Sequence, residues 1–108
     1  MKSTIAQGQM FVCHSFPFPH SNTKNETQVW VKVREDNEHS VFVDNSAMAR
    51  VAVKAQSRLR CTEVWHLSDE YYERGVAEGR FVPIDDLRDT DKVCDEKGWP
   101  RYEIDLGF

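Results

Sequence analysis

The sequence lacks the long apolar runs that membrane insertion requires. Hydrophobic residues make up 40% of its 108 positions, but uninterrupted apolar runs, such as residues 10–13, span only a few positions. A membrane-spanning helix needs about 20 consecutive apolar residues, so we expect no transmembrane segment. The first seven residues also lack the apolar stretch of a secretion signal. We therefore expect a cytoplasmic protein without a membrane partner.

The sequence is also poor in the motifs that mark enzymes and metal sites. Its five glycines form no phosphate-binding loop, and it has neither a nucleophile-elbow serine nor a paired-histidine motif. The three cysteines and four histidines are scattered, and their spacing is not that of a zinc knuckle. We predict no metal and no other cofactor, and we assign no catalytic residue.

Cys13, Cys61 and Cys94 are predicted to be free thiols, because nothing directs the chain to an oxidising compartment. His14 follows Cys13 directly, but neighbouring side chains on a strand point to opposite faces, which argues against a catalytic dyad. A small enzyme that uses a carboxylate or Cys13 stays open as the third functional hypothesis.

Alternating β-branched and aromatic residues predict several strands. In residues 28–34, Val29, Val31 and Val33 share one face, and Trp30, Lys32 and Arg34 share the other. Residues 28–34 and 40–44 are predicted to form a hairpin with a loop of about four or five residues. The full set of expected strands is 9–14, 28–34, 40–44, 61–67, 81–84 and 102–106, with Pro83 placing its strand at a sheet edge.

Two helices are expected. Residues 47–60 follow the capping sequence 44–46 and are rich in alanine, although Val51 and Val53 leave a strand as the alternative. The second helix begins after Ser68 as N-cap, ends near Gly79, and has Tyr72, Val76 and Tyr71 on its apolar face. Residues 85–97 form a solvated loop or a short helix.

This order of elements predicts the fold class. We expect one small α+β domain over residues 1–108, with a mainly antiparallel sheet of about four to five strands and one or two helices on one face. The edge strand near Pro83 and the strand 102–106 leave a homo-oligomer open, because exposed edges can pair across a dimer axis.

Charge divides the chain into two unlike halves. Residues 1–60 contain eight Lys or Arg against five Asp or Glu, whereas residues 61–108 contain six against thirteen. On a helix, Arg50, Lys54 and Arg58 would form a basic ridge, with Arg60 close by. Nucleic acid, an acidic protein and the acidic half of the chain itself are all candidates to neutralise this ridge.

The acidic half has two interpretations. It either binds a basic protein patch or mimics the charge of nucleic acid, or it only keeps the protein in solution. The residues that we select for an acidic face are Glu70, Glu73, Asp85, Asp86 and Asp89.

Aromatic residues supply the remaining candidates for partner binding. Phe16 and Phe18 alternate with prolines that stiffen the chain, so their rings either project towards a partner or close the core. Trp30 shares its strand face with Lys32 and Arg34, which is typical of a stacking platform for bases, unless a helix covers it. Trp65 and Trp99 pose the same question.

These features favour a non-enzymatic binding protein that contacts another protein through charged and aromatic surfaces. Small acidic domains without catalytic motifs are often regulators, inhibitors or accessory proteins, including those of phages and mobile elements. Nucleic-acid binding through Arg50, Lys54, Arg58 and Arg60 is the alternative.

Overall fold

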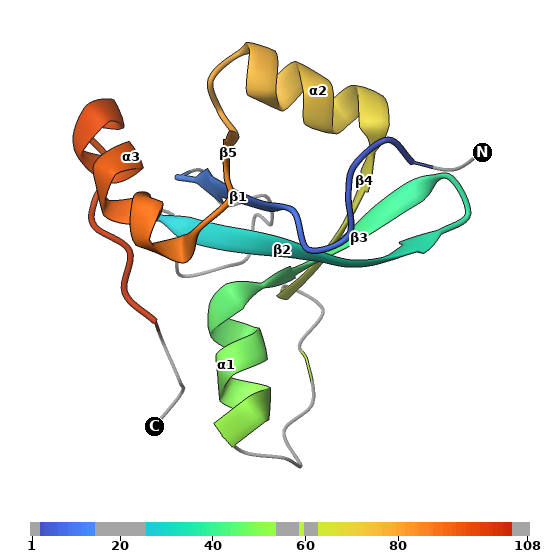
Figure 1. Ribbon diagram of the computed structural model, residues 1–108, viewed down its shortest axis with the longest axis horizontal. Coiled ribbons are helices and arrows are strands. Elements are labelled where there is room, and N and C mark those ends of the chain that lie inside the picture. The colour runs from blue at the N-terminus through green and yellow to red at the C-terminus, as the bar shows by residue number, and fades with distance from the viewer. Residues whose placement is uncertain (1–2, 15–25, 54–58, 60–62, 105–108) are drawn as a thin grey trace.

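The computed structural model describes residues 3–14, 26–53, 59 and 63–104, which form an antiparallel sheet and three α-helices (Figure 1). The predicted α+β class is confirmed. The elements are β1 (Met10–Cys13), β2 (Gln28–Asp36), β3 (His39–Asp44), α1 (Asn45–Val53), β4 (Val64–Ser68), α2 (Asp69–Ala77), β5 (Val82–Ile84), the 3₁₀ helix η2 (Leu87–Asp89) and α3 (Thr90–Lys97).

The strand order is β4-β3-β2-β1-β5, and every neighbouring pair is antiparallel. The predicted β2–β3 hairpin is confirmed, but its turn is shorter than expected because pairing continues to Asp36 and His39. Of the two turn residues, Asn37 has a φ of 53°, a left-handed conformation that asparagine tolerates. Strands β4 and β5 form the edges, which confirms the edge position predicted for Pro83.

Both faces of the sheet are covered, whereas the sequence led us to expect helices on one face only. Figure 1 shows α2 on one side of the sheet and α1 on the other. The α2 face carries an aromatic-rich core of Ile5, Phe11, Cys13, Trp30, Phe42, Leu67, Tyr72 and Phe81. The opposite face buries Val12, Val29, Ile84 and Val93, so α3 packs there.

The predicted helix signals are confirmed in the described part of the chain. The Asp44 carboxylate accepts a hydrogen bond of 2.9 Å from the Ser46 amide at the start of α1, which excludes the strand alternative for residues 47–53. Ser68 caps α2 by accepting from the Tyr71 amide at 3.2 Å. Gly79 has a φ of 75° just after α2. Residues 90–97 adopt the short-helix alternative.

The predicted last strand is wrong for residues 102–104, which are irregular, while residues 105–106 lie outside the described part. Side chains anchor this segment in place of a strand ladder. The Tyr102 hydroxyl lies 3.1 Å from the Ser46 hydroxyl and accepts a hydrogen bond of 3.0 Å from the Asn45 side chain. Ile104, inside the predicted strand, is 48% exposed.

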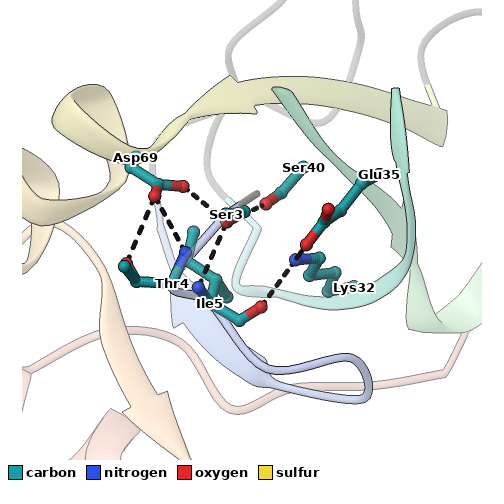
Figure 2. A network of polar contacts seen from close by, with 7 residues as sticks. All are labelled: Ser3, Thr4, Ile5, Lys32, Glu35, Ser40 and Asp69. Atoms are coloured by element: carbon teal, nitrogen blue, oxygen red, sulfur yellow. Dashed lines mark hydrogen bonds and ion pairs between the residues drawn. The ribbon is translucent and has the colours of Figure 1, made fainter. Parts of the chain in front are cut away.

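A polar network fastens the N-terminal segment onto the sheet (Figure 2). Asp69, in the first turn of α2, accepts hydrogen bonds from the Ser3 hydroxyl at 2.5 Å and from the Thr4 amide at 3.0 Å. The Ser3 hydroxyl also lies 3.0 Å from that of Ser40. Because Ser3 has a single hydroxyl proton and gives it to Asp69, Ser40 is the donor to Ser3.

Candidate protein-binding site

An exposed aromatic and cationic surface lies where α2 meets the edge strand β4. We call Trp65, Tyr71 and Arg80 the Tyr71–Arg80 surface. Tyr71 is 39% exposed, and its ring meets the half-buried ring of Trp65 edge-on at a centroid distance of 6.1 Å. The Arg80 guanidinium lies over the Tyr71 ring, 5.5 Å from its centroid. The surface therefore offers two aromatic groups and a fixed cation on one patch.

Arg80 is held in place from two directions. Its Nε and Nη2 atoms donate hydrogen bonds of 3.0 and 2.8 Å to the same Glu78 carboxylate oxygen. Its guanidinium also lies 5.3 Å from the centroid of the Phe81 ring. The hydrogen bond to Glu78, followed by one to Tyr71, raises the pKa of Arg80 above its ordinary value. A group fixed in this way loses little conformational entropy when a partner binds.

The core beneath this surface keeps the rings rigid. Phe81 is buried and contacts Trp65 edge-on at 5.3 Å and Phe11 at 4.5 Å. Gly75 in α2 allows this packing, because a Cβ atom there would lie 2.2 Å from Phe81 Cδ2. Trp65 lies in the edge strand β4 and Phe81 directly precedes the other edge strand, β5, so their contact joins two distant segments of the chain in one core.

The structure corrects the stacking platform expected from Trp30, Lys32 and Arg34. Trp30 is fully buried in the aromatic-rich core, and its indole N–H donates to the Gln28 side-chain oxygen at 3.3 Å. Lys32 is also buried, with 2% of its surface exposed. The physical reason is that both faces of this sheet are covered, so the Trp30 ring and the Lys32 ammonium group are inside the protein, and only Arg34 of the three is exposed.

Of the four residues of the predicted basic ridge, the structure describes only Arg50. This residue, half-buried in α1, forms an ion pair with Glu63, which agrees with neutralisation by the chain's own acidic half. Lys54, Arg58 and Arg60 lie outside the described residues. Phe16 and Phe18 also lie outside them.

The predicted acidic face falls into two separate groups. Glu70 and Glu73 are exposed on α2, whereas Asp85, Asp86 and Asp89 follow β5. Figure 1 shows the first turn of α2 and the segment after β5 at different ends of the molecule. In the second group, Asp86 accepts from the Arg88 amide at 2.9 Å and pairs with its guanidinium at 2.8 Å, so this carboxylate also has a local structural role.

The buried Cys13 and the half-buried Asp44, which lie at the same end of the sheet, have shifted pKa values. Burial raises the pKa of the Cys13 thiol to about 12, which keeps it protonated and unreactive at neutral pH. His14 instead stacks on Trp99, with ring centroids 6.1 Å apart. Burial also raises the pKa of Asp44 to about 6, and the nearby Glu63 carboxylate adds to the shift.

The described ranges are 3–14, 26–53, 59 and 63–104. Within them, no group of three or more His, Cys, Asp or Glu side chains is arranged to hold a metal ion. None of the helices described there has the length and apolar character needed to cross a bilayer.

Comparison with known proteins gives no match: no protein-family model, no curated protein and no solved structure resembles the chain. Functional inference therefore depends on the chemistry of the surface itself.

Sequence reasoning left Trp65 open as a partner-binding aromatic residue but assigned no partner role to Tyr71 or Arg80. Tyr71 was expected on the apolar face of α2, but the helix turns it towards the β4 edge. One signal was available in the sequence: Glu78 and Arg80 flank Gly79, and a glycine that ends a helix can bring the side chains on either side together. The contact with Trp65 depends on tertiary packing and has no local signal.

Proposed function

We propose that this protein acts by binding another protein, as a small non-enzymatic regulator, inhibitor or accessory protein of the cytoplasm. The observation that carries the proposal is the Tyr71–Arg80 surface. Trp, Tyr and Arg are the three residue types most enriched at the energetic centres of protein interfaces. Here one of each lies on a single patch, with Tyr71 39% exposed and the side chain of Arg80 41% exposed.

Preorganisation supports the same proposal. Glu78 and the rings of Tyr71 and Phe81 fix the Arg80 side chain before any partner binds. An isolated solvent-exposed arginine would lose about 0.5–1.5 kcal/mol of conformational freedom on binding, and much of that loss has already occurred here.

The chain offers a matched control for an experimental test. Arg88 makes the same two-bond ion pair with an acid two residues before it, at 3.1 and 2.8 Å from Asp86. Its side chain is 89% exposed, and among the described residues no aromatic ring lies under it. Arg80→Ala and Arg88→Ala therefore remove the same charge, but only the first disturbs the aromatic surface.

The test is affinity capture from a host lysate, with and without nuclease, read by mass spectrometry. We expect a specific protein that is retained after nuclease treatment, lost with Tyr71→Ala or Arg80→Ala, and kept with Arg88→Ala. Circular dichroism should show that the variants are folded. Recovery that disappears with nuclease would contradict the proposal in favour of nucleic acid. If Arg80→Ala and Arg88→Ala retain the captured protein equally well, the Tyr71–Arg80 surface is not its binding site.

A further inference from the structure

The N-terminal segment, residues 3–9, is joined to the first turn of α2. The Asp69 carboxylate accepts hydrogen bonds from the Ser3 hydroxyl at 2.5 Å, the Thr4 amide at 3.0 Å and the Thr4 hydroxyl at 3.2 Å (Figure 2). The bond from Ser3, followed by those from Thr4, lowers the pKa of Asp69, so the carboxylate stays ionised at neutral pH. Hydrogen bonds to an ionised acceptor are roughly twice as strong as neutral ones. The N-terminal segment therefore holds this end of the helix.

The same segment is anchored to the sheet. Ile5 is buried in the aromatic-rich core together with Leu67 and Tyr72. Its carbonyl accepts a hydrogen bond of 2.6 Å from the buried Lys32 ammonium group. The Gly8 amide donates a bond of 2.9 Å to the Lys32 carbonyl. The N-terminal segment thus connects the first turn of α2 to β2.

The other attachments of α2 lie further along the helix. Its buried residues are Tyr72 and Gly75, and Val76 is partly buried against the same core. Beyond the helix, the Gly75 carbonyl accepts hydrogen bonds of 2.9 and 3.1 Å from the amides of Arg80 and Phe81. The two ends of α2 are therefore held by different parts of the chain.

This division runs through the Tyr71–Arg80 surface. Tyr71 lies two residues after Asp69, in the turn that the N-terminal segment holds. Arg80 belongs to the other end, where Glu78 fixes its guanidinium. The approach of this guanidinium to within 5.5 Å of the Tyr71 ring centroid therefore requires both ends of α2 to be in place.

We propose that the N-terminal segment regulates the Tyr71–Arg80 surface: while it is attached to Asp69, it aligns Tyr71 with Arg80 for a protein partner. When it detaches, the first turn of α2 loosens and Tyr71 moves away from Arg80, which stays paired with Glu78. Coupling between two sites is reciprocal, so a partner bound to the aligned surface also holds the segment in place. Asp69 is therefore a positioning residue. This inference rests on the proposed function, because it adds a means of regulation to the same surface.

The test uses two double variants of the full chain. Ser3→Glu with Thr4→Glu removes both hydroxyl donors and places two carboxylates against Asp69, while the sequence of α2 is unchanged. Ala6→Glu with Gln7→Glu is the matched control, because it adds the same charge to exposed residues of the same segment. Only the first double variant should detach the segment.

Hydrogen exchange of backbone amides measures how often each part of the protein opens. In the Ser3→Glu, Thr4→Glu variant we expect the amides of Gly8 and Tyr71 to exchange at least about tenfold faster. The Arg80 amide, which is bonded to the Gly75 carbonyl, and the β2–β3 hairpin should keep their rates. Unchanged rates in the hairpin also show that the variant is folded.

Ser68→Ala tests the coupling from the helix side. The Ser68 hydroxyl caps α2 by accepting from the Tyr71 amide, so its loss should speed exchange of the Gly8 amide at least about threefold. Asp86→Ala is the matched control, because Asp86 caps η2 in the same way by accepting from the Arg88 amide at 2.9 Å. It should leave the Gly8 amide unchanged.

Three results would overturn the proposal. The first is equal exchange of the Tyr71 amide in the two double variants. The second is an equal effect of Ser68→Ala and Asp86→Ala on the Gly8 amide. The third is faster exchange throughout the chain, the β2–β3 hairpin included, which would show general destabilisation instead of regulation.

Capture from the host lysate separates this inference from the proposed function. The Ser3→Glu, Thr4→Glu variant should capture at least about fivefold less protein than the Ala6→Glu, Gln7→Glu control. If capture depends on Tyr71 but is equal for the two double variants, the proposed function stands and this inference falls. If the unsubstituted protein captures nothing, the proposed function fails, and the exchange rates still decide whether the segment aligns Tyr71.

Discussion

The ammonium group of Lys32 donates a hydrogen bond of 2.6 Å to the backbone carbonyl of Ile5, inside the protein. The same ammonium group pairs with Glu35 at 2.9 Å, and Figure 2 shows it reaching towards the N-terminal segment. Backbone bonds of 2.9 Å from the Gly8 amide to the Lys32 carbonyl and from the Lys32 amide to the Gln9 carbonyl continue this attachment. The N-terminal segment thus covers a buried charge.

Lys32→Ala should destabilise the protein by about 3 kcal/mol, because it removes one partner from a buried ionic contact and leaves a void. Urea unfolding measures the change. Lys32→Met, which keeps most of the apolar stem, separates the packing contribution from the polar one. The control is Arg34→Ala on the same strand, where the side chain is 59% exposed and a change within about 0.5 kcal/mol is expected. A similar small change for Lys32→Ala would contradict the assigned role.

Gly75→Ala should destabilise the protein by about 1–3 kcal/mol, because the new methyl group would overlap the Phe81 ring. Helix propensity alone predicts the opposite sign, with a gain of about 1 kcal/mol for alanine. Thermal or urea unfolding therefore decides between the two effects. The double variant Gly75→Ala, Phe81→Leu should recover part of the loss. A stabilised single variant would show that α2 moves away from Phe81 easily.

Asp44 should make stability depend on pH. Burial raises its folded pKa from 3.8 to about 6, so between these values the folded state holds a proton that the unfolded state has released. Stability from this group is therefore full below pH 3.8 and is lost as the pH rises through about 6. Asp44→Asn keeps a capping oxygen for Ser46 and removes the titration.

We expect the free energies of unfolding of Asp44→Asn and the unsubstituted protein to be similar near pH 4. At about pH 7.5 the variant should be more stable by about 1–3 kcal/mol. Glu38→Gln, at an exposed residue of the β2–β3 turn, is the control and should leave the pH profile unchanged. A difference between Asp44→Asn and the unsubstituted protein that is the same at both pH values would reject the assigned cause.

Local sequence signals predicted the elements whose determinants are local. Asp44 and Ser68 mark helix starts through their own side-chain oxygens, and Pro83 marks an edge through its missing N–H. The burial of Lys32 could not be predicted, because its partner Ile5 belongs to the N-terminal segment, and the contact between the two depends on the tertiary fold. Sequence alternation also suggested a strand around Tyr102, where side-chain contacts with α1 hold the chain in an irregular path.

The candidate site was less predictable than the fold. Phe16, Phe18 and Trp30 were chosen for their aromatic character, and Trp30 proved to be core. Whether an aromatic residue faces solvent depends on how many layers cover the sheet, which composition does not report. Tyr71 became part of a surface because Trp65, from β4, and Phe81, which directly precedes β5, meet beside it.

The position of β1 between β2 and β5 has a consequence during synthesis of the chain on the ribosome. β1 is translated before the other described strands, yet its pairing with Val82 and Ile84 must wait until β5 has emerged. Until then one edge of β1, with its buried residues Phe11 and Val12, is open to the wrong partners. Chains truncated before β5 should therefore aggregate more readily than the full chain, even though the β2–β3 hairpin and α1 are complete.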